Sequence, residues 1–355
     1  MERDIISWLE WHHFKVMFYH EDGDGICSAA LVLKKFPDFK YHAREGPKME
    51  NSFLANLIRK NPELIVFLDI PVDQEWKTIE EIKSKLPNTN IIVIDHHIPE
   101  KDLNSERAIH YNPRFDKKDV YLPASYLVYK ILSKRFNMKE HAWIAAVGII
   151  SDYGHKDCRE FIEQVRKDNP DLLDYKNDED IFKTKLGKAS EMISSAITMK
   201  GLWGANYTLR KIVASDNCDE FLNNQQLLRW HRIVREEIDR IISKFESEKK
   251  VYDDLKLIIG DVESKFNVTS VIASILSKKY VDKIIVLRKK TNSGWKISAR
   301  NQTLKLNIGE LIKKSCEGVG IGGGHERAAG AIINDWDTFE KNLISNLRVQ
   351  INCCS

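Results

Sequence analysis

Short apolar runs alternate with amphipathic stretches along the first part of the chain. The runs FKVMFY, LIVFLDI and NIIVI predict strands at residues 14–19, 64–70 and 90–94. Helical patterns separate or follow these runs, at residues 28–36, 78–86, 124–136 and 141–150. Buried strands that alternate with helices are typical of a parallel sheet with both faces covered. We therefore expect residues 1–175 to form a parallel-sheet α/β domain.

The remainder of the chain divides after a long helical stretch. Residues 176–250 are mostly helical in pattern, and 227–249 carries an apolar stripe opposite charged positions. An α/β alternation then resumes, with strands expected at 255–259, 283–287 and 295–299, helices at 268–278 and 308–314, and a glycine-rich turn after the second helix. The pattern predicts a helical connector over 176–250 and a smaller α/β domain over 251–355.

Composition narrows the class of protein. The 355 residues include 55 Lys and Arg against 52 Asp and Glu, so any contact with nucleic acid depends on a local basic surface. No apolar run approaches the roughly 20 residues that span a bilayer, and the N-terminus lacks a signal-peptide pattern, so we expect a cytoplasmic protein without a membrane partner. The six cysteines include no CxxC pair, which argues against a zinc site and agrees with reduced thiols.

Candidate chemistry follows the ends of the predicted strands. His20, Asp22 and Asp24 come after the first strand in the segment HEDGDG, whose glycines allow a tight turn. Asp69 ends the second strand. Taken alone, the acidic turn fits a solvated loop equally well, and Asp69 fits a turn or helix cap. Because ligands of open α/β sheets bind beyond the carboxyl ends of the strands, these residues are nevertheless expected at one site.

Two further groups complete the pattern. Asp95, His96 and His97 end the third strand, where neighbouring side chains point in opposite directions, so one imidazole is expected to bind a metal and the other to face a substrate. Asp152 closes an apolar helix. Oxygen donors with a few imidazoles and no thiolate favour Mn²⁺ or Mg²⁺. The number of carboxylates fits two ions that share one of them, an arrangement suited to in-line attack on phosphorus.

These motifs, in this order, resemble those of the DHH phosphoesterase family, named for the Asp-His-His found here at 95–97. Its other motifs are matched by HEDGDG at 20–25, Asp69 in FLDIP and Asp152 in GIISDYG. The resemblance covers nearly the whole chain. The form H-x-D-x-D-G is more similar to the RecJ-like nuclease branch than to the pyrophosphatase or nanoRNase branches, which set the His four residues before the first Asp.

The C-terminal part is similar to the DHH-associated C-terminal domain of that family. GGGHERAAG at 322–330 resembles its signature, and SAR at 298–300 resembles its second substrate-binding element. Glycine-rich backbone can bring N–H groups close to a phosphate at a helix start, and Arg can add charge-assisted hydrogen bonds. The residues expected to hold the substrate are Ser298, Arg300, Gly323, Gly324, His325 and Arg327.

The resemblance also implies roles at the metal site, in a cleft between the two α/β domains. The implied metal ligands are His20, Asp22, Asp24, Asp69, His96 and Asp152. Asp69 would bridge two Mn²⁺ ions, with Mg²⁺ as the alternative metal, and His20 would be a ligand or a neighbour of the first ion. His97 would face the scissile phosphate, Asp95 would orient a histidine, and a metal-activated water would be the nucleophile.

The resemblance thus predicts a two-metal exonuclease that hydrolyses single-stranded DNA or RNA. One alternative is a phosphodiesterase for very short oligonucleotides, as in the nanoRNase branch, or for cyclic dinucleotides. Another is a non-catalytic scaffold of a replication or repair complex, which the full set of metal-site residues disfavours. Replication and repair proteins are candidate partners. The sequence indicates neither the polarity of cleavage nor the oligomeric state.

Overall fold

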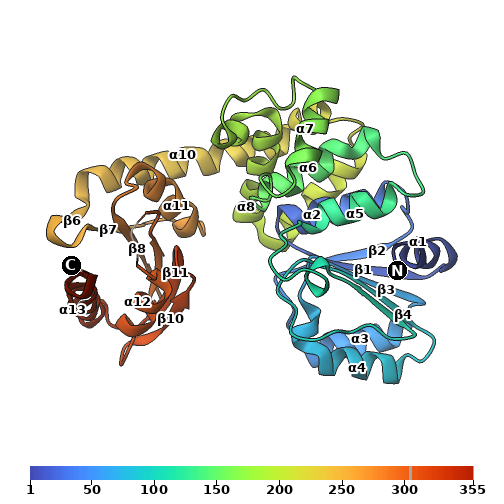
Figure 1. Ribbon diagram of the computed structural model, residues 1–355, viewed down its shortest axis with the longest axis horizontal. Helices are drawn as coiled ribbons and strands as arrows, with labels where there is room; N and C mark the ends of the chain where they lie inside the picture. The colour runs from blue at the N-terminus through green and yellow to red at the C-terminus, as the bar shows by residue number, and fades with distance from the viewer. Residues whose placement is uncertain (304–305, 355) are drawn as a thin grey trace. The chain divides into compact units, whose positions relative to one another are not determined.

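The computed structural model describes residues 1–303 and 306–354 and divides into two compact units, one of Met1–His231 and one that begins at Arg232 (Figure 1). The division falls inside the stretch expected as a connector, 176–250. Two helices of that stretch, α8 (Lys185–Ala214) and α9 (Cys218–Leu222), contribute buried side chains to the core of the first unit. Among the described residues, no helix has the length and apolar character needed to cross a membrane.

The first unit is built on a five-stranded parallel sheet in the order β2-β1-β3-β4-β5. Its strands are β1 (Lys15–His20), β2 (Lys40–Arg44), β3 (Leu64–Leu68), β4 (Asn90–Ile94) and β5 (Ala108–Tyr111). Tyr19 pairs with Leu68, and Leu68 pairs with Ile94, so the carboxyl ends of the three central strands lie level. The residues that follow these strands therefore meet at one edge of the sheet.

Helices cover both faces of this sheet (Figure 1). Alternate side chains of the strands belong to two separate apolar clusters, one on each face, as a two-residue repeat requires. One face carries α3 (Asn51–Lys60) and α4 (Trp76–Lys85); the other carries α2 (Gly23–Leu33), α5 (Ala124–Leu132) and α6 (Ala142–Ser151). The first unit also contains α1 (Glu2–Trp11) and α7 (Arg159–Asp168). The predicted parallel α/β domain is confirmed.

The second unit contains a six-stranded mixed sheet in the order β10-β11-β9-β8-β7-β6, in which only β7 and β8 pair in parallel. The strands are β6 (Lys250–Tyr252), β7 (Leu257–Asp261), β8 (Ile284–Thr291), β9 (Gly294–Arg300), β10 (Gly320–Gly324) and β11 (Ala328–Ile333). The helices are α10 (Gln225–Glu248), which crosses from the first unit, α11 (Thr269–Lys279), α12 (Ile308–Ser315) and α13 (Trp336–Cys354). The smaller α/β domain is confirmed, with a mixed sheet.

The glycine-rich segment expected as a turn is a strand, so this prediction was wrong. Residues Gly320–Gly324 form the edge strand β10, in which Gly323 pairs with Gly330 of β11. A Cβ atom at Gly322 would lie 2.6 Å from Cys316 Sγ, just beyond the end of α12. The glycines therefore allow a strand to pack closely against its neighbours, a use that their number alone does not distinguish from a turn.

Candidate metal centre

Acidic and imidazole side chains converge at the carboxyl edge of the first sheet. His20 ends β1, Asp69 follows β3 and His96 follows β4, while Asp152 lies at the C-terminal cap of α6. Their polar atoms, with those of Asp22, Asp24 and His97, form three overlapping groups, each with ligand atoms within 4.8 Å of one another: His20, Asp22 and Asp69; Asp24, His96 and Asp152; Asp69, His96 and His97. The structure brings the acids and imidazoles of all four motifs together.

The first group is centred on His20. Its Nδ1 lies 2.8 Å from Asp22 Oδ2 and 3.6 Å from Asp69 Oδ2. Asp22 is the N-cap of α2, and its Oδ1 accepts a hydrogen bond from Gly25 N at 2.9 Å. The cap leaves the other oxygen of Asp22 directed at the imidazole, so the local turn itself positions this carboxylate.

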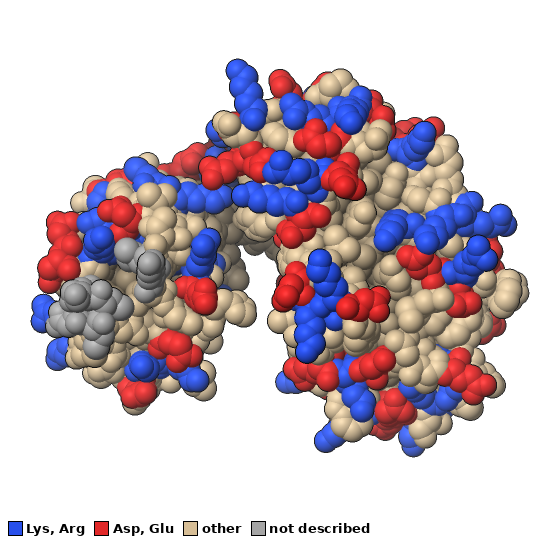
Figure 2. All heavy atoms as spheres, in the orientation of Figure 1, with Lys and Arg blue, Asp and Glu red and all other residues tan. Residues whose placement is uncertain are grey.

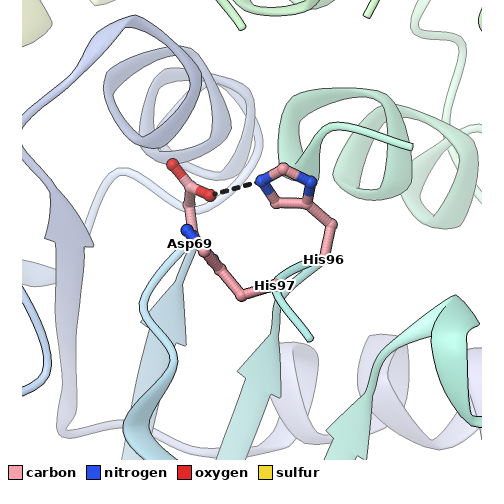
Figure 3. A group of neighbouring side chains, drawn as sticks. All are labelled: Asp69, His96 and His97. Atoms are coloured by element: carbon pink, nitrogen blue, oxygen red, sulfur yellow. Dashed lines mark ion pairs between the residues drawn. The ribbon is translucent and has the colours of Figure 1, made fainter. Parts of the chain in front are cut away.

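The second group is centred on His96. Its Nε2 lies 3.3 Å from Asp69 Oδ1 and 3.5 Å from Asp152 Oδ2. Figure 3 shows the ion pair between His96 and Asp69. Tyr121 Oη donates to Asp152 Oδ2 at 2.7 Å, which fixes that carboxylate. The sequence reasoning missed Tyr121, because no motif marks it and only the fold brings it to the site.

Asp69 connects the two groups. Its Oδ2 faces His20 and its Oδ1 faces His96, although the side chain is only 1% exposed and neither oxygen has a hydrogen-bond partner among the described residues. The backbone of Asp69 has φ 59°, in the left-handed region that costs a non-glycine residue about 1 kcal/mol or more. Two buried carboxylate oxygens directed at separate donor groups fit a ligand shared by two cations.

Asp24 differs from the other carboxylates. Its two oxygens accept hydrogen bonds from Ala124 N at 2.6 Å and Ser125 N at 2.9 Å, at the start of α5. The side chain is 1% exposed. Asp24 therefore joins α2 to α5 and also faces His96 and Asp152, so a structural role accompanies any role as a ligand.

The DHH segment is fixed from several sides. His97 Nδ1 lies 2.8 Å from Asp95 Oδ1, and Asp95 is completely buried. Two side chains that follow β5 hold the main chain: Asn112 Nδ2 donates to His97 O at 2.9 Å and Arg114 Nε donates to His96 O at 2.7 Å. The histidine that Asp95 contacts is thus His97, whose side chain is 41% exposed.

Burial and mutual contact shift the titration of these groups. Burial alone would lower the pKa of both imidazoles, but Asp22 and Asp69 raise the pKa of His20 to about 11, and Asp69 raises the pKa of His96 to about 10. Burial would raise the pKa of Asp69, but His20 and His96 lower that pKa below its usual value. Burial raises the pKa of Asp152 to about 6 against the opposing effect of His96. In the metal-free chain, the protons on His20 and His96 therefore supply the positive charge that a cation would supply.

A cavity of about 780 Å³ adjoins the end of β2. Arg44 lines it together with Lys48, Glu50, Phe53 and Leu202. Arg44 pairs with His20 across β1 and β2, its Nε has no hydrogen-bond partner among the described residues, and its guanidinium lies 4.5 Å from the centre of the Phe53 ring. Sequence reasoning missed Arg44, because β2 is a half-exposed edge strand without an apolar run.

The predicted substrate-binding residues of the second unit lie on β9, on β10 and on the β10–β11 hairpin, with β11 between the two strands. Ser298 and Arg300 are in β9, and Gly323 and Gly324 are in β10. His325 and Arg327 lie in the turn between β10 and β11, and both are exposed. The Arg300 guanidinium donates to Ser270 Oγ at 2.7 Å and Ser274 Oγ at 3.2 Å, which holds it against α11.

The donor set of the first unit fits divalent cations of the Mn²⁺ or Mg²⁺ type. It consists of carboxylate oxygens and imidazole nitrogens without a thiolate, and the oxygens of Asp69 are buried without a hydrogen bond. In the metal-free chain the protonated imidazoles of His20 and His96 compensate the buried charge of Asp69, and bound cations would take over this role. The arrangement therefore combines a place for positive charge with two donor groups around one shared carboxylate.

Comparison with protein families gives two matches. A family model described as the DHH family, N-terminal domain, matches residues 16–149, and one described as the DHHA1 domain matches residues 254–347. Together they cover more than half of the chain. No curated protein matches the sequence.

Solved structures share the fold at low sequence identity. RecJ from Thermus thermophilus in complex with Mn²⁺ has a TM-score of 0.71 at 15% identity, over 98% of this chain and 54% of that one, so the chain spans about half the length of that RecJ. The pGpG-specific phosphodiesterase PggH from Vibrio cholerae has a TM-score of 0.54 at 15% identity, over 95% and 99%. CDC45 from Entamoeba histolytica has a TM-score of 0.58 at 11% identity, over 98% of both chains.

Proposed function

Since this chain belongs to the DHH family and carries a DHHA1 domain, we propose that it is a metal-dependent exonuclease that hydrolyses phosphodiester bonds of single-stranded DNA or RNA. The observation that carries the proposal is the placement of Asp69. Its two buried oxygens face two separate groups of carboxylates and imidazoles, 3.6 Å from His20 and 3.3 Å from His96. The likeness to RecJ supports the same reaction class.

Six side chains would hold two cations, of which Mn²⁺ is the expected metal and Mg²⁺ the alternative: His20, Asp22, Asp24, Asp69, His96 and Asp152. When bound, the cations would activate a water and neutralise charge on the phosphate. His97, held by Asp95, would donate a hydrogen bond to a phosphate oxygen. Tyr121 would keep Asp152 in position through its 2.7 Å hydrogen bond.

The surroundings of the site support a nucleotide substrate. The cavity at the end of β2 is lined by Arg44, the register neighbour of His20, whose Nη2 donates to Lys48 O, and its volume of about 780 Å³ is sufficient for a nucleotide unit. An arginine is suited to a phosphate oxygen through charge-assisted hydrogen bonds. In the second unit, Ser298, Arg300, Gly323, Gly324, His325 and Arg327 remain the proposed substrate-binding residues.

The test is digestion of end-labelled single-stranded DNA and RNA ladders with Mn²⁺ and with Mg²⁺. We expect stepwise shortening by the natural chain and a loss of about 100-fold or more in Asp152→Asn, since a metal ligand contributes several kcal/mol to the transition state. Asp157→Asn, at an exposed carboxylate five residues further on, is the matched control and should retain activity. Digestion by Asp152→Asn at the natural rate would contradict the assignment.

A second candidate function is hydrolysis of very short oligonucleotides or cyclic dinucleotides. The likeness to PggH supports it, because that protein is described as a pGpG-specific phosphodiesterase and so acts on a dinucleotide. Substrate length discriminates the two proposals: rates that are highest for dinucleotides and fall with longer strands support this alternative. Strand binding without cleavage under either metal would instead favour the non-catalytic scaffold.

A further inference from the structure

A fourth group of titratable side chains adjoins the metal centre through Asp95, whose Oδ1 contacts His97. It consists of Asp73 in the short helix Val72–Glu75, Asp95 after β4 and His110 in β5. One potential ligand atom of each lies within 4.8 Å of the others. The group shares no member with the three groups around Asp69 and His96. It also follows or belongs to adjacent parallel strands of the sheet.

The three side chains are buried and incompletely paired. Asp73 is 1% exposed, and Asp95 and His110 are 0% exposed. Asp73 Oδ1, Asp95 Oδ2 and both ring nitrogens of His110 have no hydrogen-bond partner among the described residues. Among the residues that the structure describes, no Lys or Arg side chain forms an ion pair with Asp73 or Asp95. Two nearby buried carboxylates without a hydrogen bond to these oxygens are unfavourable unless positive charge lies between them.

In each carboxylate, one oxygen is held by a hydrogen bond, and this contact orients the other oxygen. Asp73 Oδ2 accepts hydrogen bonds from Glu100 N at 2.5 Å and Lys101 N at 3.1 Å, which leaves Oδ1 directed at the group. Asp95 uses Oδ1 for His97 and leaves Oδ2. The arrangement thus fixes one oxygen of each carboxylate and presents the other.

The imidazole is prepared as a ligand. The Phe115 ring stands at 90° to the His110 ring with centroids 4.8 Å apart, which restricts its rotation. Burial lowers the pKa of His110, although Asp73, Asp95, Asp102 and the main chain of Lys101 oppose this shift, and a lowered pKa favours the neutral ring, which offers a lone pair.

We propose that Asp73, Asp95 and His110 supply three ligands to one divalent cation of the Zn²⁺ type, with a water in the fourth position, distinct from the candidate catalytic metals. One imidazole and two carboxylates are ligands that Zn²⁺ takes in proteins. When no two of three atoms are more than 4.8 Å apart, a central point lies within about 2.8 Å of each. Side-chain movements of about 0.7 Å would therefore bring them to the bond lengths of about 2.1 Å that zinc requires.

The site would connect the region after β3, the DHH segment and β5. Through the Asp73 contacts with Glu100 and Lys101 it would also hold the loop after His97. The cation would act on His97 only through Asp95, which makes Asp73 and His110 positioning residues. This inference does not depend on the proposed exonuclease activity.

Metal counting tests the proposal. The full chain is incubated with excess Zn²⁺, desalted and analysed by elemental mass spectrometry. We expect Asp73→Asn and His110→Gln each to hold one ion fewer per chain than the natural protein. His13→Gln, at an exposed histidine, is the matched control and should keep the full count. Asp69→Asn should keep the ion of this site, so failure of the catalytic assignment remains distinguishable. Equal counts in His110→Gln and the natural chain overturn the proposal.

A crystal of the natural chain grown with Zn²⁺ keeps the test valid if a variant fails to fold. An anomalous peak at the zinc edge within about 2.3 Å of a His110 nitrogen would support the site. Density without anomalous signal at hydrogen-bond distances, as expected for a buried water, would overturn it.

Discussion

At the scale of single residues, Asp69 is the residue of the first unit in which several unfavourable features occur together. It combines burial, a φ of 59° and two oxygens without a hydrogen bond. Strained backbone persists where the surroundings hold it in place, and Tyr153, directly after Asp152, shares the feature with φ 57°. Tyr153 takes this conformation at the C-terminal end of α6, where a left-handed residue commonly ends a helix, whereas Asp69 takes it where its side chain faces both donor groups.

The first prediction concerns this carboxylate. Asp69→Asn removes the negative charge shared by the two donor groups, so we expect Mn²⁺ affinity to fall about 100-fold or more, which isothermal titration calorimetry measures. Asp116→Asn, an exposed carboxylate, is the control and should bind as the natural chain does. Undiminished affinity in Asp69→Asn would show that the cations do not share this residue.

Proton competition gives the second prediction. The pKa of His20 is raised to about 11 and that of His96 to about 10, so both imidazoles carry protons at pH 7 in the metal-free chain. Metal ligands must be deprotonated, and binding therefore releases protons. We expect Mn²⁺ affinity to rise steadily from pH 6 to pH 9. The heat of binding should depend on the ionisation enthalpy of the buffer; a buffer-independent heat would contradict the prediction.

At the scale of elements, the approach of α2 to α6 brings the first and fourth motifs together. A Cβ atom at Gly23 would lie 2.3 Å from Ser151 Oγ, and Ser151 precedes Asp152. Only a residue without a side chain allows this distance. Gly23 in the DGDG segment therefore serves helix packing as well as the turn.

The third prediction follows from that contact. Gly23→Ala should destabilise the fold by about 1–3 kcal/mol, the range for overpacking, and reduce activity about 100-fold by displacing Asp22 from Asp152. Thermal unfolding and oligonucleotide digestion measure the two effects. The second change Ser151→Gly removes both clashing atoms and should restore much of the loss. A double variant no better than Gly23→Ala would place the defect elsewhere.

Elements with a long apolar run could be predicted from the sequence, and edge elements could not. The strand at 90–94 was predicted with the bounds of β4, because a buried parallel strand is apolar on both faces. The edge strands β2 and β10 escaped prediction, since one is half exposed and the other is mostly glycine. No sequence motif identifies three further residues of the proposed sites, because only the fold brings them close to the other members. They are Asp73, His110 and Arg44.

At the scale of the whole molecule, charge is distributed rather than concentrated. Figure 2 shows Lys and Arg side chains interspersed with Asp and Glu on the face in view. The formal net charge of +3 agrees with this mixture. A surface of this kind attracts a nucleic acid weakly at long range, so the proposed binding would depend on a few specific phosphate contacts.

The fourth prediction is therefore a shallow salt dependence. If Arg44, Arg300 and Arg327 provide the phosphate contacts, the logarithm of the affinity for a single strand should fall with the logarithm of salt concentration with a slope of about −2, at about 0.7 per phosphate. Fluorescence anisotropy with a labelled oligonucleotide measures this slope. A slope steeper than about −5 would indicate a broad basic surface instead.

The fifth prediction concerns thermal stability. A cation bound only by the folded chain stabilises it by about 2.7 kcal/mol at 100 times its dissociation constant, so saturating Mn²⁺ should raise the Tm of the natural chain by about 5–10 °C. Calorimetry measures this shift. Asp69→Asn should show a much smaller one, and an equal rise in both chains would mean that the ions bind elsewhere.

The buried oxygens of Asp69, which face only the imidazoles of His20 and His96, have a consequence for the lifetime of the protein in the cell. A chain whose native state is completed by an ion unfolds, and is degraded, more often when that ion is scarce. If the proposed cations bind, their scarcity would reduce the number of molecules as well as the rate of each. Nutrient supply would thus set the amount of the protein without any change in its synthesis.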